Sequence, residues 1–309
     1  MSAARAIVFA YHDVGVRCLK ALLSADIEVA LVVTVKDDPA ENRWFASVAD
    51  TAREYGLPLA MPDDANSSEL AERAAQLDPD FLFSFYYRSM LGAPLLRSAR
   101  RGALNMHGSL LPKYRGRAPV NWAILNGERE TGATLHYMVE RADAGDIVDQ
   151  LAVPILDDDD AREVFAKVTT AAEIVLARSL PGLLAGDAPR RPQPIEPGQY
   201  FGRRRPEDGR IDWSQPALRI HNLVRAVAPP FPGAFTEVDG QRWVIHRTRV
   251  EPRIITPSER ARLFGSQGMC YAACRDGGVL RVLSAANAAG PVDLAHIAGE
   301  LEARPAALS

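Results

Sequence analysis

Short apolar segments that alternate with helical ones constrain the first half of this chain more than any other feature. Residues 6–11 (AIVFAY) are wholly apolar, and residues 27–34 form a second apolar segment. Strands that are buried on both faces of a parallel sheet have this continuous apolar character. Residues 16–24, between them, have helical spacing. With a further strand at 80–85, the alternation predicts a doubly wound, mostly parallel α/β sheet with right-handed crossovers.

Two helix starts can be predicted from their capping residues. Residues 12–15 are predicted to form a turn in which Asp13 is the N-cap, and Asn66 or Ser67 is predicted to cap a later helix. His12 follows a strand, at the edge where open α/β sheets bind ligands. A hydrogen bond within the turn would explain His12 equally well.

The composition changes after residue 185. Residues 185–202 are rich in proline, glycine, arginine and glutamine and lack periodicity, as is typical of a linker. Short predicted strands follow, separated by glycine-containing turns. The chain end after residue 300 is expected to be frayed. The predicted division is a catalytic domain over 1–187, a linker over 188–203 and a small β-domain over 204–309.

The overall composition excludes several classes of protein. A net charge of −3 and a pI near 6.1 give no support for bulk nucleic-acid affinity. Cys18, Cys270 and Cys274 form neither a disulfide framework nor a zinc motif, so we expect buried thiols and no metal. No G-x-G-x-x-G or P-loop lysine supports dinucleotide or ATP binding. The absence of a signal peptide and of a long apolar run predicts a cytoplasmic protein.

Asn105 and His107 are the first candidates for catalysis. They stand two residues apart in a predicted strand, so their side chains should point to the same face. This pairing suits acyl transfer, because the amide can donate to an oxyanion and the imidazole can move a proton. Asp143, which follows a strand predicted at 131–139, is the candidate to orient the ring. The alternative is a turn or a satisfied polar pair without a catalytic role.

The surrounding motifs resemble those of the folate-dependent formyltransferases. The resemblance rests on N-x-H-x-S-L-L-P at 105–112, a glycine at 116 and D-x-G at 143–145. Within the family, the chain resembles most closely the branch that formylates UDP-4-amino-4-deoxy-L-arabinose in lipid A modification and polymyxin resistance. The stretches that carry this second resemblance are FAYHD (9–13), HGSLLPKYRGRAPVNW (107–122), FGRRRP (201–206) and HNLVRAVAPPFPGAF (221–235).

The resemblance implies a Rossmann-like catalytic domain followed by an open OB-like barrel, with 10-formyl-tetrahydrofolate as co-substrate. It implies that Asn105, His107 and Asp143 are catalytic, and it implies no metal. The expected partner is a small nucleotide sugar, with neither nucleic acid nor membrane insertion. The folate contacts implied by position are Ser89, Met90, Leu91, Arg117, Val139, Glu140, Arg141, Ala142 and Asp143.

Two other functions compete with this one. Methionyl-tRNA formyltransferases use the same donor, but Gly108 stands where that branch usually has proline, again by resemblance. A silent folate-binding protein is disfavoured by the intact set of three candidate catalytic residues. The resembling enzymes also carry a second, dehydrogenase domain, which we expect to be absent here and supplied by a separate protein.

The sequence leaves several roles open. We interpret His136 as a structural residue, while Trp122 suits either a substrate pocket or the core. Arg203, Arg204 and Arg205 could contact a diphosphate or only solvate the linker. The identity of the amino sugar and the oligomeric state are also left open.

Overall fold

The structure is a computed structural model that describes residues 3–37, 42–196, 200–255 and 261–308. The chain divides into two compact units. The first comprises residues 1–119, 130–153 and 166–202, and the second comprises residues 120–129, 154–165 and 203–309. Each unit is described by itself.

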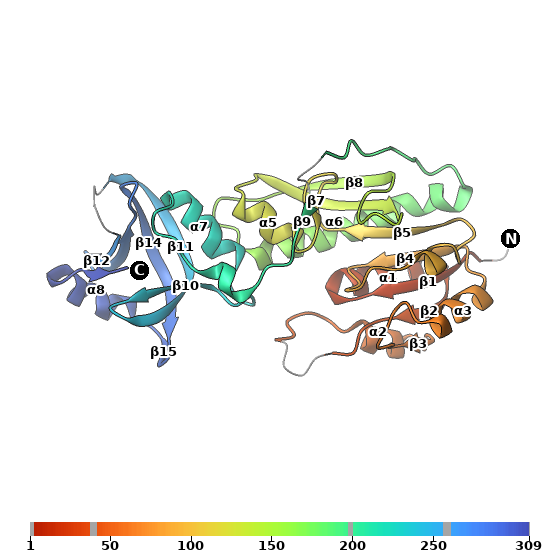
Figure 1. Cartoon of the computed structure of the whole chain (residues 1–309), viewed down its shortest axis with the longest axis horizontal. Helices are drawn as coiled ribbons and strands as arrows, with labels where there is room; N and C mark the ends of the chain where they lie inside the picture. The colour runs from red at the N-terminus through yellow and green to blue at the C-terminus, as the bar shows by residue number, and fades with distance from the viewer. Residues whose placement is uncertain (1–2, 38–41, 197–199, 256–260, 309) are drawn as a thin grey trace. The chain divides into compact units, whose positions relative to one another are not determined.

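The first unit contains a seven-stranded sheet with the order β3-β2-β1-β4-β5-β7-β8 (Figure 1). The pairs from β3 to β5 are parallel, whereas β7 runs antiparallel to β5. The mostly parallel sheet predicted from the sequence is therefore confirmed. The strands are β1 (Arg5–Ala10), β2 (Glu28–Val33), β3 (Leu59–Ala60), β4 (Phe81–Phe85), β5 (Gly102–His107), β7 (Glu130–Tyr137) and β8 (Ile147–Pro154).

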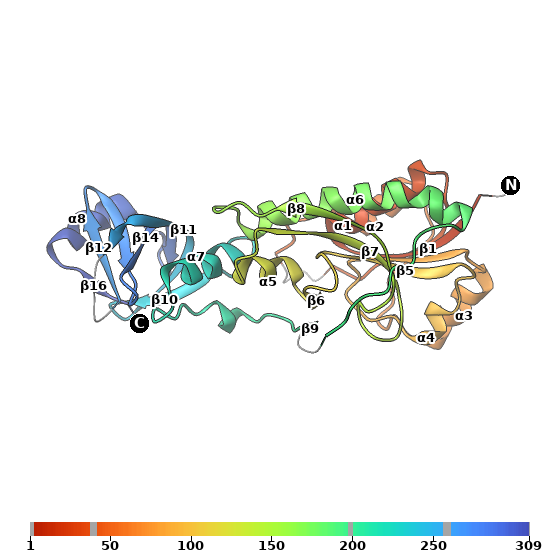
Figure 2. The ribbon, with the colours of Figure 1, turned by 90° about the horizontal axis from the view of Figure 1, so that it is seen from above.

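Helices cover both faces of this sheet, which confirms the doubly wound arrangement. Figure 2 shows α1, α2 and α6 on one face and α3 and α4 on the other. The helices are α1 (His12–Ser24), α2 (Val48–Glu54), α3 (Ser68–Leu77), α4 (Ala93–Leu96) and α6 (Ala161–Ala185, of which residues 161–165 belong to the second unit). The side chains of Ile7, Leu31 and Leu82 are fully buried and belong to one core cluster with Leu70 and Leu95. Each such burial stabilises the fold by about 1.5–3 kcal/mol.

One helix start was predicted correctly and the other was not. Ser67 caps α3 by accepting a hydrogen bond from the Leu70 N–H, as predicted. The prediction of a turn at 12–15 was wrong, because α1 already begins at His12 with Tyr11 as N-cap. The Asp13 carboxylate accepts from the Ala46 N–H instead of capping α1.

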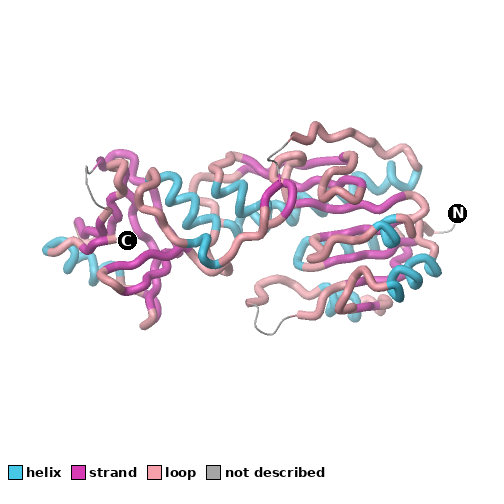
Figure 3. Tube along the Cα trace, viewed as in Figure 1, coloured by secondary structure: helices cyan, strands magenta, loops and turns pink. Residues whose placement is uncertain are grey.

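The second unit contains an antiparallel sheet with the order β10-β11-β14-β13-β12-β16. Its strands are among the magenta segments around the C-terminus in Figure 3. A bridge between Val238 and Leu308 joins its two edge strands, so the sheet is nearly closed into a barrel, as predicted. The elements of this unit are α5 (Pro119–Leu125, of which Pro119 belongs to the first unit), η1 (Pro206–Gly209), α7 (Ala217–Ala226), β10 (Ala234–Val238), β11 (Gln241–Ile255), β12 (Arg262–Ser266), β13 (Met269–Ala273), β14 (Gly278–Asn287), β15 (Gly290–Pro291), α8 (Leu294–Ala303) and β16 (Ala306–Ala307).

The end of the chain is more ordered than the sequence suggested. The helix α8 continues to Ala303, and β16 pairs with β12. The expectation of a frayed end after residue 300 was therefore wrong for the part up to Leu308. The reason is tertiary, since Leu301 and Leu308 are buried in the core of the barrel. The three cysteines are free and buried, as expected.

Helix α6 departs from another expectation. By length and composition it could cross a membrane, although no such run was predicted. Half of its most apolar window is buried within the structure. The core helix of a soluble protein can have the same length and apolar composition, so this is weak evidence for a membrane span.

The segment predicted as a linker contains a short strand. Residues Tyr200–Phe201 form β9, which pairs in parallel with β6 (Arg115–Gly116). Both strands belong to the first unit.

Candidate active site

The site lies where β5 ends, next to the loop that follows β7. Asn105 and His107 come from β5, in register with His136 and Thr134 of β7. The structure brings both residues to Asp143: the Asn105 Nδ2–Asp143 Oδ1 distance is 3.4 Å, and the His107 Nδ1–Asp143 Oδ1 distance is 3.6 Å. An amide, an imidazole and a carboxylate therefore converge on one spot.

Asp143 is held in a strained turn. Its backbone φ is 49°, a value that residues other than glycine seldom adopt. The Gly116 N–H donates to Asp143 Oδ2 at 2.9 Å, and the Arg115 Nη2 donates to the neighbouring Ala142 carbonyl at 2.6 Å. Strained residues of this kind persist where surrounding contacts determine them, often at functional sites.

The electrostatics favour the ionised form of Asp143. Burial is the largest single influence and would by itself raise the pKa of this carboxyl. Attraction to the His107 ring, aided by the Gly116 N–H, outweighs burial and holds the pKa of Asp143 well below its usual range. The site thus contains a fixed negative charge beside His107.

The hydrogen bonds of His107 define where its protons lie. Its Nε2 is 2.9 Å from the Tyr114 carbonyl oxygen, and a carbonyl can only accept, so Nε2 carries a proton. Its Nδ1 faces the carboxylate of Asp143. The Tyr114 carbonyl and the Asp143 carboxylate together fix the orientation of the His107 ring.

His136 belongs to the same cluster, which the sequence did not indicate. Its Nδ1 donates to the Tyr137 carbonyl at 2.9 Å, so its Nε2 is free to accept from Asn105 Nδ2 at 3.1 Å. Its Nε2 also lies 3.6 Å from Asp143 Oδ1. His136 therefore fixes the direction in which the Asn105 amide points, and it lies in direct contact with two of the three candidate catalytic residues.

Arginines in or next to β6 donate hydrogen bonds in or beside both segments predicted to contact folate, which are residues 89–91 and 139–143. Arg115 donates to Ala142 in one segment, and Arg117 Nη2 donates to the Arg88 carbonyl beside the other segment at 3.3 Å. Each segment exposes a large apolar side chain: Met90 is 55% and Val139 is 46% accessible. Exposed apolar groups beside a polar cluster are typical of a ligand-binding surface. Of the remaining predicted contacts, Ser89, Glu140 and Arg141 are exposed, and Leu91 is buried in the core.

Several residues considered from the sequence have other surroundings. His12 stacks on Phe45 with ring centroids 3.9 Å apart, and its Nδ1 accepts from the Asp13 N–H at 2.9 Å. Arg204 lies over the Trp122 ring at 4.9 Å and donates to the Asp208 carbonyl.

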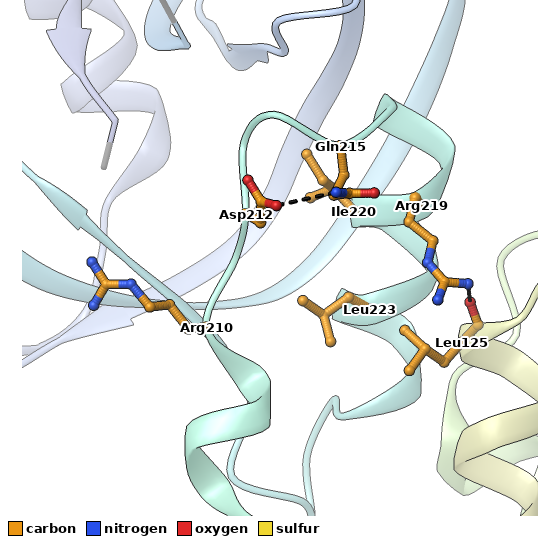
Figure 4. A pocket seen from close by; sticks show the side chains of 7 residues that line it. All are labelled: Leu125, Arg210, Asp212, Gln215, Arg219, Ile220 and Leu223. Atoms are coloured by element: carbon orange, nitrogen blue, oxygen red, sulfur yellow. Dashed lines mark hydrogen bonds between the residues drawn. The ribbon is translucent and has the colours of Figure 1, made fainter.

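The second unit also has a pocket of about 300 Å³ (Figure 4). Two of its charged side chains, Asp212 and Arg219, have partners within the unit. Arg219 donates to the Leu125 carbonyl at 2.6 Å, and Gln215 donates to Asp212 at 3.1 Å. None of the predicted site residues lines it. The lining residues are Leu125, Arg210, Asp212, Gln215, Arg219, Ile220 and Leu223.

Comparison with known families agrees with this geometry. Residues 5–180 match the formyl transferase family, and residues 204–292 match the formyl transferase C-terminal domain. The chain belongs to the formyltransferase family. The enzyme class and the family inferred from the motifs around Asn105 are therefore confirmed, whereas the particular branch is not tested by these matches.

Solved structures of similar fold include several sugar formyltransferases. An N-formyltransferase from Helicobacter canadensis, solved with folinic acid and dTDP-3-aminofucose, is 20% identical, with a TM-score of 0.71 over 91% of this chain and 99% of that one. WlaRD, a sugar 3N-formyltransferase solved with dTDP and 5-N-formyl-THF, is 18% identical, with a TM-score of 0.72 over 95% and 99%. A 4-N formyltransferase from Francisella tularensis is 22% identical, with a TM-score of 0.60 over 75% and 91%. At these identities the likeness concerns the fold.

Proposed function

We propose that this formyltransferase transfers a formyl group from 10-formyl-tetrahydrofolate to the amine of a nucleotide sugar. The observation that carries the proposal is the convergence of Asn105 and His107 on Asp143 within a formyltransferase fold. Neighbouring folds that were solved with folate derivatives and dTDP sugars support this choice of donor and acceptor class.

In the proposed reaction, the neutral amine of the sugar attacks the formyl carbon and forms a new C–N bond. Asn105 donates an N–H to the resulting oxyanion. The N–H that contacts Asp143 at a long 3.4 Å is the one that can turn to this oxyanion, while the shorter contact to His136 holds the amide in place. The C–N bond to the folate nitrogen then breaks.

The proton must move from the attacking amine to the leaving folate nitrogen. We assign this step to His107, whose charged form is stabilised by the ionised Asp143 at 3.6 Å. The products are the sugar formamide and tetrahydrofolate. The residues proposed to hold the donor are those of the two segments, including Met90 and Val139, together with Arg117, which follows β6.

We propose UDP-4-amino-4-deoxy-L-arabinose as the acceptor and lipid A modification as the setting, because the motif at 107–122 resembles that branch. Gly108 is consistent with this choice. A Cβ at this position would stand 1.7 Å from the Tyr86 hydroxyl, so the space that proline needs is filled here. The division into domains over 1–187 and 204–309 with a linker over 188–203 remains a prediction.

The test is turnover with 10-formyl-tetrahydrofolate and either UDP-4-amino-4-deoxy-L-arabinose or methionyl-tRNA, with the formylated product detected by mass. Formylation of the sugar alone is expected. Formylation of the tRNA alone would overturn the acceptor and leave the chemistry standing. Formylation of neither would overturn this sugar as acceptor and direct the assay to other nucleotide amino sugars.

The role of Asn105 has its own test. The Asn105→Ala variant should lose turnover by on the order of a hundredfold or more, since one oxyanion donor is worth that much. Asn287→Ala is a suitable control, because this amide accepts from the Ala289 N–H in a turn of the second unit. Near-native turnover by Asn105→Ala would refute the assignment.

A further inference from the structure

The segment between α6 and β9 is bound to the loops of the candidate site. We call the described residues 190–193 and 200–201 the strap. Arg191 and Ile147 exchange two backbone hydrogen bonds of 2.8 and 3.0 Å, and the Arg190 guanidinium lies 3.8 Å from the centre of the Tyr137 ring. Because Tyr137 and Ile147 flank the Asp143 loop in sequence, the strap lies across the base of that loop.

Gln193 makes the most specific of these contacts. Its Nε2 donates to the Asp143 carbonyl at 3.1 Å and to the Gly145 carbonyl at 2.6 Å. Both acceptors are backbone carbonyls, so only the amino side of the amide can face them. Two N–H groups on one nitrogen thus hold both ends of the turn in which Asp143 has a φ of 49°.

The other side of the Gln193 amide shows that this orientation has a cost. Among the described residues, no group hydrogen-bonds its buried Oε1. Burying an acceptor without a partner is unfavourable. The amide is nevertheless oriented with both N–H groups toward the Asp143 turn, which indicates that this turn, and not general packing, fixes its direction.

The second part of the strap holds the side chain of the same residue. Phe201 pairs with Gly116 in the β9–β6 ladder, and the Phe201 carbonyl accepts from the Arg117 N–H at 2.9 Å. The Gly116 N–H in turn donates to Asp143 Oδ2. The backbone of Asp143 is therefore held by Gln193, and its carboxylate is held by a strand that pairs with the strap.

We propose that Gln193 is a positioning residue of the active site, which acts by fixing the Asp143 turn so that its carboxylate faces His107. The inference rests on the proposed function, because it takes Asp143 to be the group that supports His107. Gln193 does not itself touch the reacting atoms. A displacement of about 1 Å in such a supporting group can lower the rate substantially.

The test is a double-mutant cycle between Gln193→Met and Asp143→Asn. Methionine has a similar length and no N–H donor. If Gln193 acts through Asp143, Gln193→Met should lower kcat about 5- to 20-fold in the natural chain and less than twofold when Asp143 is already asparagine. The KM values for donor and acceptor should remain within about twofold. Equal losses in both backgrounds, or a loss in KM alone, would overturn the inference.

A matched control removes the general effect of the substitution. Gln76→Met makes the same chemical change at an exposed position of α3 and should leave kcat unchanged. If Gln193→Met does not fold, Gln193→Asn is measured in the same cycle, because its amide is one methylene too short to reach both carbonyls.

A measurement without substrate separates this inference from the proposed function. Amide hydrogen exchange in Gln193→Met should become at least about fivefold faster at Gly116 and through residues 142–147, with the rest of the first unit unchanged. Unchanged exchange there would overturn the positioning role, whatever the substrate is. Faster exchange in a chain that formylates no amino sugar would leave Gln193 as the residue that holds the turn and overturn only the proposed function.

Discussion

The space beside Gly108 permits a quantitative prediction about the active site. A Cβ at position 108 would stand 1.7 Å from the Tyr86 hydroxyl oxygen and 2.8 Å from Cζ of that ring. Heavy atoms essentially never approach a Cβ within 3.0 Å, so in Gly108→Ala the ring must retreat by about 1.3 Å. Forced overpacking of a buried site costs about 1–3 kcal/mol. Since His107, the last residue of β5, immediately precedes Gly108, turnover should also fall by about tenfold or more.

Removing the Tyr86 hydroxyl should relieve most of this cost. In Tyr86→Phe the nearest ring atom is Cζ at 2.8 Å, and the required retreat falls to about 0.2 Å. We therefore expect Gly108→Ala to cost less than about 1 kcal/mol in the Tyr86→Phe background, a coupling of about 1–2 kcal/mol. Urea unfolding of the natural chain, the two single variants and the double variant measures this coupling. Gly202→Ala is a control, because a Cβ there meets nothing within 4 Å. Costs that add within about 0.5 kcal/mol would refute the clash as the cause.

Three further predictions follow from the site and its surroundings. Asp143→Asn should lower kcat on the order of a hundredfold, since the amide cannot stabilise a charged His107. Because the folded-state pKa of Asp143 is depressed, the stability that Asp143 contributes is present above about pH 4 and lost as the pH falls further. The variant should therefore lose less stability in acid than the natural chain, and equal acid sensitivity of the two chains would contradict this. Burial, aided by Arg88, lowers the pKa of His12 to about 3, so the free energy of unfolding should fall by about 1.4 kcal/mol per pH unit between pH 6.5 and 3. His12→Gln should flatten that slope, measured by urea unfolding at a series of pH values. An unchanged slope would show that His12 does not resist protonation. Gly116→Ala should lower the free energy of unfolding by about 2–4 kcal/mol, because the φ of Gly116 is 100° and a Cβ would stand 2.3 Å from the Phe201 carbonyl oxygen. Thermal or urea unfolding measures this loss, and a loss below about 0.5 kcal/mol would mean that β6 and β9 separate freely.

Local patterns of residues were enough to predict the features that depend on local burial. Continuous apolar runs predicted the buried strands β1 and β2. The spacing of Asn105 and His107 was informative for the same reason, since residues two apart in a strand share a face whatever the rest of the chain does. The resemblance to the formyltransferase motif implied a catalytic role for Asp143, whose position after a predicted strand had made it only a candidate.

Tertiary structure alone decided which distant residues support that site. Gln193 lies 50 residues from Asp143 within a stretch without periodicity, and nothing in its sequence context distinguishes it from a solvated linker residue. His136 looked like an ordinary strand residue until pairing between β7 and β5 set it against Asn105. Register between strands and the path of an irregular segment depend on long-range packing, which leaves no local pattern to read. The closure of the barrel by Val238 and Leu308 has the same origin, because an edge strand is specified by its partner and not by its own composition.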